Sequence, residues 1–180
     1  MALEVLKARR SIRCYDPEYV IPKEDLQKIL DAALNSPSTL NAQENDIIVV
    51  TNKELIQKAN DVVYNSLDDK AKERFINRQK RYGVNQIIMY DCSALILLVK
   101  NERANPAVLG VDTGILAMSI MTAAESIGLS TVAMGIVVRP QVEQLFNLAP
   151  GSLCLGIGIG KAKNTDVDSK QVLRKVTFLE

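Results

Sequence analysis

The chain has 180 residues, among them 22 Lys and Arg, 21 Asp and Glu, three Cys, no Trp and no His. The absence of histidine excludes Ser-His-Asp and Cys-His nucleophile systems, HExxH zinc peptidases and His-ligated metal sites. A formal net charge of +1 argues against binding of nucleic acid or an anionic membrane through bulk charge.

The length and the absence of repeats or linkers predict one domain, residues 1–180. Apolar runs such as residues 94–99 are far shorter than the roughly 18 residues that span a bilayer, and residues 1–7 carry an acid within their apolar part. We therefore expect no membrane segment, no signal peptide and a cytoplasmic location. Cys14, Cys92 and Cys154 are widely separated, which favours buried thiols over a disulfide framework or a zinc site.

The first half of the chain predicts three helices after a short N-terminal one, with a single strand among them. A helix begins at Ile21-Pro22, carries apolar residues at helical spacing, and is stopped by Pro37. The run 47–50 predicts a strand, and Asn52 predicts the N-cap of the next helix. The densely charged segment 68–82 predicts an exposed helix.

The second half predicts buried strands around a long helix. Residues 94–99, 131–138 and 153–159 are apolar enough to form strands buried on both faces. The helix predicted over 106–128 has only two charges, Asp112 and Glu125, so it must be buried within the domain or between two subunits. A short helix over 140–146 and a weakly alternating final strand over 172–179 complete an α+β sandwich around one central sheet.

The glycine-rich strand near residue 158 does not predict a nucleotide-binding loop. GxGxxG would need glycine where Lys161 stands, and GxxxxGK[ST] fails at Leu155 and Ala162. We interpret this segment as a buried strand that another backbone or a ligand approaches closely. The basic run 78–81 is interpreted as a solvated helix face.

Two polar segments are the strongest local signals. Arg9, Arg10 and Arg13 follow the first helix together with Ser11. Complementing the helix dipole explains one or two of these cations, whereas three planar guanidinium groups predict an anion or cofactor site. The polar segment 36–43 predicts a loop between helix and strand.

Several motifs occur in a fixed order along nearly the whole chain. They are Arg9-Arg10-Ser11-Ile12-Arg13-Cys14-Tyr15-Asp16, Ile21-Pro22, Ser36-Pro37-Ser38-x-x-Asn41-x-Gln43, Tyr90-Asp91-Cys92-Ser93-Ala94, Val111-Asp112-Thr113-Gly114 and Glu125-x-x-Gly128-Leu129-Ser130-Thr131. Their order and spacing resemble those of the FMN-dependent nitroreductase family. The resemblance implies an α+β, three-layer sandwich with a central, mostly antiparallel sheet flanked by helices, in an intertwined homodimer with FMN at each subunit interface.

The resemblance also implies a set of FMN-binding residues. Those of the N-terminal segment would contact phosphate, ribityl and ring, with a fixed cation at Arg13 stabilising the reduced flavin. Lys161 and Lys163 would complete the phosphate site, and the 36–43 segment would reach the FMN of the other subunit. The full implied set is Arg9, Arg10, Ser11, Arg13, Pro37, Ser38, Thr39, Asn41, Asn85, Met134, Gly135, Lys161 and Lys163.

Individual roles within this set follow from the matched motifs. Asn85 matches an asparagine that hydrogen-bonds the flavin ring edge, and Met134-Gly135 match a turn that supplies an amide near flavin N5. The chain departs from the family there, since Ala133-Met134 replace Pro-x or Pro-Glu. It also carries Glu44-Asn45 where Pro-Trp is usual, so the packing of that Trp is replaced or lost.

The implied function is that of an FMN-dependent NAD(P)H oxidoreductase that reduces nitroaromatic or quinone-type acceptors in a ping-pong order. NADH or NADPH would be the donor and a small aromatic molecule the acceptor, with no protein nucleophile and no metal. The helical segment between residues 62 and 85 would limit the size of the acceptor or favour anionic ones. The alternatives are a dehalogenase, flavin-fragmenting enzyme or azoline oxidase of the same superfamily, a non-catalytic FMN-binding protein, and an interaction domain.

Overall fold

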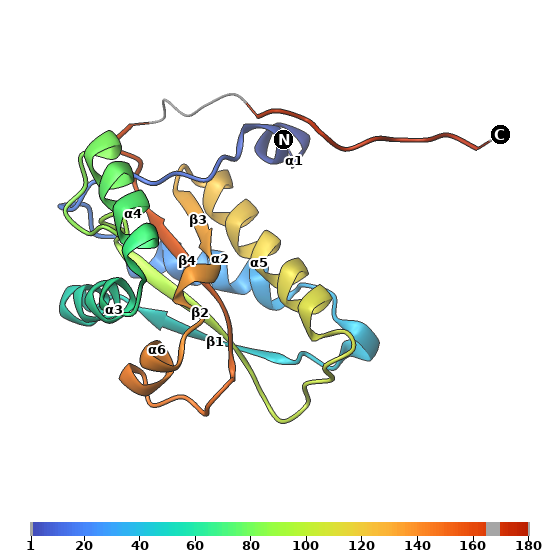
Figure 1. Ribbon diagram of the computed structural model, residues 1–180. Coiled ribbons are helices and arrows are strands. Elements are labelled where there is room, and N and C mark those ends of the chain that lie inside the picture. Colours follow the sequence, from blue (N-terminus) through green and yellow to red (C-terminus); the bar gives the residue numbers. More distant parts are fainter. Residues whose placement is uncertain (1, 165–169, 180) are drawn as a thin grey trace.

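The computed structural model describes residues 2–164 and 170–179. Four strands form one sheet in the order β1-β2-β4-β3, and every ladder between neighbours is antiparallel (Figure 1). The strands are β1 (Asn45–Val50), β2 (Ala94–Lys100), β3 (Ser130–Met134) and β4 (Leu153–Gly160). The predicted α+β architecture with a central antiparallel sheet is confirmed.

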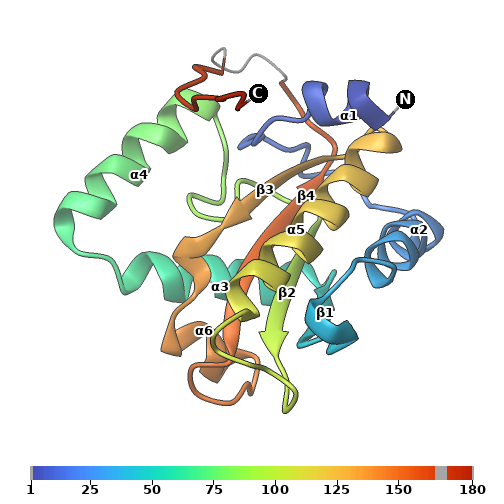
Figure 2. The ribbon, with the colours of Figure 1, turned by 90° about the vertical axis from the view of Figure 1, so that its right-hand side faces the viewer.

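Helices cover both faces of the sheet (Figure 2). One face packs against α2 and α5, and the other against α3 and α6 together with the buried Phe75 of α4. The helices are α1 (Ala2–Ala8), α2 (Lys23–Leu34), α3 (Lys53–Asn65), α4 (Asp69–Tyr82), α5 (Leu109–Ser126) and α6 (Pro140–Leu145). None of them, within the residues the structure describes, is long and apolar enough to cross a membrane.

Strand β2 shows why an uninterrupted apolar run folds here as a strand. Leu95 and Leu97 join the core beneath α3 and α6, whereas Ile96 and Leu98 join the core beneath α2 and α5. Because successive side chains of a strand point to opposite faces, a strand covered on both sides must be apolar at every position.

The glycines of β4 are required by close packing. A Cβ at Gly156 would collide with Val137, and one at Gly160 would lie 2.9 Å from the ring of Tyr15. The groups that approach Gly156 and Gly160 most closely within the chain are side chains, and the backbone carbonyl of Met134 lies 3.6 Å from the Cβ position of Gly156. Tyr15 is fully buried, and burial raises its pKa well above the ordinary value.

Side chains cap the starts of two helices. Asn52 accepts the Leu55 N–H at 2.9 Å, which confirms the predicted N-cap, and Asp68, which was not predicted as a cap, accepts the Ala71 N–H at 2.7 Å. The three cysteines are free thiols, with Cys14 and Cys92 buried and Cys154 half-buried. Burial raises the pKa of Cys92 to about 12.

Two predicted strands need correction. The strand expected over 131–138 ends at Met134, because the chain turns there into a 3-10 helix, Gly135–Val137. The strand expected over 172–179 is absent, and Phe178 and Leu179 of that segment are 84% and 94% exposed. An extended segment becomes a strand only against a free sheet edge, and residues 170–179 run away from the sheet of their own chain (Figure 1).

Candidate functional site

The basic residues from the two ends of the chain are brought together at one end of the sheet. The segment after α1 runs beside β3, where the Ile12 N–H donates to the Thr131 carbonyl at 3.1 Å. It then runs beside the residues that follow β4, where the Asp16 N–H donates to the carbonyl of Lys161 and the Lys163 N–H donates to the carbonyl of Cys14. We call Arg9, Arg10, Ser11, Arg13, Lys161 and Lys163 the basic cluster.

One carboxylate balances part of the basic cluster. Burial raises the pKa of Glu125 near the end of α5, and the nearby charges of Arg9 and Arg10 oppose this shift. The Nε of Arg9 is nevertheless buried and has no hydrogen-bond partner. A buried guanidinium nitrogen without an acceptor is costly, so this end of α5 is suited to receive an anionic group.

The predicted loop lies at the other end of α5. Residues 36–43, which we call the 36–43 loop, include a 3-10 turn, Thr39–Asn41. Asp112, in the first turn of α5, accepts the Thr39 N–H at 2.9 Å and the Thr39 hydroxyl at 3.1 Å. Leu40 at the tip of this loop is 98% exposed.

One chain does not bring the basic cluster and the 36–43 loop together. Asp112 holds the loop and Glu125 lies beside the cluster, and these two residues are 13 positions apart on α5. At about 1.5 Å per residue this separation corresponds to about 20 Å of helix. Figure 1 shows α1 near the last turn of α5 and the segment after α2 near its first turn. The basic cluster and the 36–43 loop therefore form two separate groups within a chain.

The polar pair Glu44-Asn45 forms hydrogen bonds next to the 36–43 loop. Glu44 is 2% exposed and its Oε1 accepts the Asn105 N–H at 3.1 Å, while the Asn45 Oδ1 accepts the Thr113 hydroxyl at 3.0 Å. Glu44 Oε2, Asn45 Nδ2 and Ser36 Oγ are buried without a partner, and their residues line a cavity of about 50 Å³. A cavity of this size and polarity has room for bridging water.

Asn85 follows α4 and takes part in a tight turn. Its N–H and that of Gln86 donate to the carboxylate of Asp91, and its carbonyl accepts from the amide of Gln79. The side chain is exposed and lines a cavity with Lys53 and Gln57 of α3. These contacts place it with α3 and α4, in neither of the two groups at the ends of α5.

Met134 and Gly135 lie where β3 ends and the 3-10 turn begins. Met134 is buried and pairs with Gly156, whereas Gly135 is exposed and a Cβ there would meet no neighbour within its own chain. The backbone turn that the sequence predicted at this position is present.

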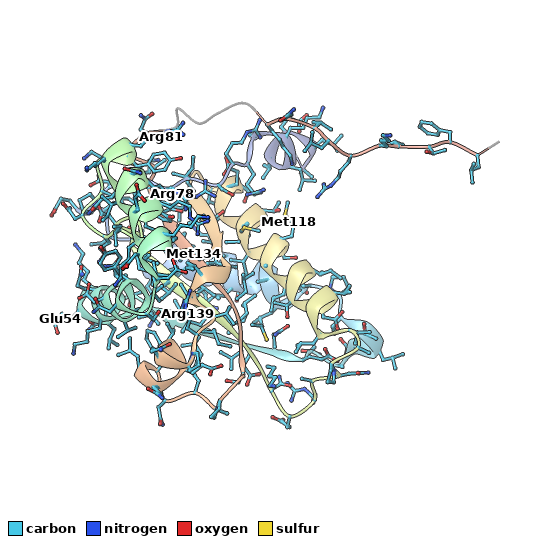
Figure 3. All side chains as sticks on the ribbon, viewed as in Figure 1. Glu54, Arg78, Arg81, Met118, Met134 and Arg139 are labelled. Carbon is cyan, nitrogen blue, oxygen red and sulfur yellow. The ribbon has the colours of Figure 1, made fainter. Side chains whose placement is uncertain are left out.

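Arg78 of helix α4 is not a simple solvated group. Arg78 is half-buried, donates to the Tyr90 hydroxyl at 2.9 Å, and lies 5.1 Å from the centre of the Phe75 ring. Figure 3 shows it on the side of α4 that faces β3, with Met134 and Arg139 below it in the same view. The interpretation of residues 78–81 as a solvated face is therefore wrong for Arg78.

Sequence reasoning did not assign roles to Asp112 and Glu125, although a signal was present. They are the only charges on an otherwise apolar helix, and each lies beside one of the two groups. No group of three or more His, Cys, Asp or Glu that could hold a metal occurs within residues 2–164 and 170–179.

Comparison with known proteins identifies relatives along most of the chain. A model described as "Nitroreductase family" matches residues 6–161. The protein named FMN reductase [NAD(P)H] from Bacillus subtilis is 30% identical over 148 residues, which are 81% of this chain and 59% of that protein. The chain thus spans less than two thirds of the length of this relative.

Solved structures are similar over nearly the whole length. A nitroreductase with bound FMN from Desulfitobacterium hafniense superposes with a TM-score of 0.82 and 25% identity, covering 99% of this chain and 98% of that one. A nitroreductase with bound FMN from Bacteroides fragilis superposes with a TM-score of 0.79 and 21% identity, with the same coverage. The second likeness concerns the fold alone.

Proposed function

The chain belongs to the nitroreductase family, and from this premise we propose that it is an FMN-dependent NAD(P)H oxidoreductase that reduces nitroaromatic or quinone-type acceptors. The names of its relatives support this activity class, since they include an FMN reductase that uses NAD(P)H and a nitroreductase with bound FMN. The fold supports it as well, because the sheet and helices match that FMN-containing structure over 99% of the chain.

The observation that carries the proposal is the basic cluster with an unsatisfied guanidinium nitrogen. Arg9 Nε is buried without an acceptor. Lys161 and Lys163 follow β4, and their backbone forms hydrogen bonds with the segment that follows α1. A phosphate supplies several strong acceptors to such a group, so these residues fit the phosphate end of FMN. Ser11 and Arg13 follow on the same segment, and there they would contact the rest of the cofactor.

The proposed functional unit is a homodimer in which each FMN contacts both chains. The outer side of α5 and the neighbouring helices line an apolar groove of about 580 Å³, which includes Val5, Ile115 and Met118. A two-fold axis across this groove would pair the two α5 helices in opposite directions. The 36–43 loop of one copy would then lie beside the basic cluster of the other, which resolves the separation of about 20 Å within a chain.

The C-terminal segment fits the same assembly. Val172, Val176 and Phe178 are 75–84% exposed on an extended segment that leaves its own sheet. Exposed apolar side chains in this number are unusual on a monomer and mark an interaction surface. We propose that residues 170–179 extend over the second copy of an intertwined dimer.

Bound FMN would supply the redox chemistry, accepting hydride from NADH or NADPH and passing it to the acceptor in a ping-pong order. The residues of this chain bind and tune the cofactor. Arg13 would place a fixed positive charge at the pyrimidine edge, where reduction adds negative charge, and so favour the reduced state. Asn85 and the backbone of Met134-Gly135 are proposed to contact the ring, and Pro37, Ser38, Thr39 and Asn41 to contact the ring from the partner side.

The test is the absorbance spectrum of the purified protein before and after each nicotinamide is added without oxygen. We expect a yellow protein whose band at about 450 nm bleaches promptly with NADH or NADPH. A yellow protein that neither donor bleaches would be a non-catalytic flavin binder. A colourless protein that does not bind added FMN would reject the proposal and favour an interaction domain.

A further inference from the structure

We propose that Asp112 is a positioning residue that holds the 36–43 loop in the shape in which Asn41 reaches the cofactor bound by a second copy of the chain. This inference rests on the proposed function. Asp112 itself does not touch the cofactor in this account, because its side chain lies behind the loop at the start of α5.

The backbone of the 36–43 loop is in an unfavourable conformation. Leu40, Asn41 and Gln43 have φ values of 51°, 55° and 51°, in the left-handed region that residues other than glycine seldom adopt. Such residues persist only where their surroundings over-determine the conformation, and they occur preferentially at functional sites. The contacts that hold the loop in this conformation therefore indicate which residues support its function.

Asp112 provides the contact on the α5 side of the loop. Its two oxygens accept the N–H and the hydroxyl of Thr39 at 2.9 Å and 3.1 Å, and the residue is only 4% exposed. Hydrogen bonds to a buried charged acceptor are stronger than bonds between neutral groups. Because Thr39 precedes Leu40 directly, this pair of bonds fixes the chain where the strained stretch begins.

A second set of bonds fixes the end of the strained stretch. Arg103 donates to the carbonyls of Ala42 and Gln43 at 2.9 Å and 3.1 Å, and the Asn101 amide donates to the Gln43 carbonyl at 3.0 Å. Within the loop, the Gln43 N–H donates to the Ser38 hydroxyl at 2.9 Å. The loop is thus held from both sides by its own chain.

The consequence is a preorganised loop with an exposed tip. Leu40 and Asn41 are exposed while the residues on either side of them are hydrogen-bonded. A loop already fixed in its binding shape avoids the entropic cost of ordering when the ligand arrives. Asp112 therefore contributes to the affinity for the cofactor that is held by the basic cluster of the second copy. Its own chain supplies only the 36–43 loop to that site.

The test uses Asp112→Asn, which retains the size of the side chain but presents an amide N–H₂ to Thr39. FMN affinity is measured by quenching of flavin fluorescence, and we expect Kd to rise about tenfold, as for the loss of one hydrogen bond to a charged acceptor. Asp31→Asn, at an exposed position on α2, is the matched control and should leave Kd unchanged. Asp112→Glu should recover part of the affinity.

Complementation distinguishes a positioning role from a merely structural one. Two variant chains carry different affinity tags, and the heterodimer is purified through both tags. An Asp112→Asn chain paired with an Arg13→Ala chain should regain one tight FMN site per heterodimer, because one site then combines an intact cluster with an intact loop. The same chain paired with Asn41→Ala should regain none, since both sites then have a defective loop.

Three results would overturn the inference: an unchanged Kd for the Asp112→Asn homodimer, recovery of tight binding with Asn41→Ala, or failure to recover with Arg13→Ala. If Asp112→Asn does not fold, Asp112→Ser replaces it, since the smaller side chain removes the carboxylate from this buried position without adding bulk. Asp112→Ser must then fall in the same complementation group as Asn41→Ala. If the wild-type protein binds no FMN, the proposed function fails and this inference falls with it.

Discussion

The two ends of helix α5 differ in how completely their charges are satisfied. At the N-terminal end of α5, both oxygens of Asp112 accept hydrogen bonds from Thr39, and Arg103 holds the other side of the same loop. At the C-terminal end, Glu125 lies near Arg9 and Arg10, and burial raises the pKa of Glu125. The buried Nε of Arg9 has no partner there.

This difference separates a loop that the chain itself holds in place from a basic cluster with a donor left over for a ligand. Ser36, Glu44 and Asn45 at the loop end also have buried polar atoms without a partner, but they line a cavity of about 50 Å³ that has room for bridging water. A loop held by hydrogen bonds on both sides keeps its geometry without a cofactor, whereas a buried donor without an acceptor carries a cost that an anion removes. We therefore expect FMN binding to change stability and dynamics chiefly at the basic cluster, and to leave the 36–43 loop nearly as it is.

The largest expected effect comes from removing the guanidinium of Arg9, whose buried Nε has no partner. Arg9→Ala should raise the Kd for FMN about 100-fold, because it deletes charge-assisted bonds to phosphate, while the apoprotein loses little stability. Lys58→Ala, at an exposed position on α3, is the control. A Kd within twofold of the wild-type value would show that Arg9, at the C-terminal end of α5, does not bind the phosphate of FMN.

The second largest effect tests whether the basic cluster of one chain lies beside the 36–43 loop of the other across a dimer interface. Met118→Lys places a charge in the apolar groove between the two ends, so we expect chains that stay folded by circular dichroism but become monomeric and bind FMN at least tenfold more weakly. Thr51→Lys, at an exposed position beyond β1, should do neither. Monomers that keep wild-type FMN affinity would refute the shared site.

A smaller, pH-dependent effect is expected at Glu125. Its pKa is raised in the folded protein, so its ionisation destabilises the fold as pH rises above the ordinary value of 4.5. Glu125→Gln should therefore raise the Tm of the apoprotein slightly at pH 7.5 and leave it equal to wild type at pH 4. The effect is small because the side chain is partly exposed to solvent. A lower Tm at pH 7.5 would mean that pairing with the arginines outweighs burial.

The smallest effect concerns strain at the tip of the 36–43 loop. Leu40→Gly should stabilise the apoprotein by at most about 1 kcal/mol, since glycine adopts a positive φ without steric cost but loses more entropy on folding. Leu40→Ala keeps the Cβ and should give no gain. Equal unfolding free energies for both variants would indicate that the loop is not strained.

Much of the fold could be predicted from the sequence because its signals are local. The apolar runs that became β2 and β4, the helical spacing that became α2, and the capping side chain of Asn52 each report on their own segment. The predicted strand 172–179 was wrong because residues 170–179 run away from the sheet of their own chain (Figure 1) and pair with neither of its edge strands, β1 and β3.

The candidate residues of the site could be named from the sequence, but the bonds that hold them in place could not. The arginines and the polar loop stood out as residues, and their motifs indicated a flavin site. The positive φ values at Leu40, Asn41 and Gln43 were not predictable, because they depend on bonds from Asp112 and Arg103, which are distant in sequence. The separation of the basic cluster from the 36–43 loop along α5 could likewise be known only from the three-dimensional structure.

Whether two chains share each flavin can be measured by sedimentation equilibrium of the purified protein, followed at the flavin band at about 450 nm. We expect the flavin absorbance to sediment with a particle of twice the chain mass of 19.8 kDa. Flavin absorbance that sediments with a particle of one chain mass would contradict it, because a single chain cannot bring the basic cluster and the 36–43 loop to one cofactor.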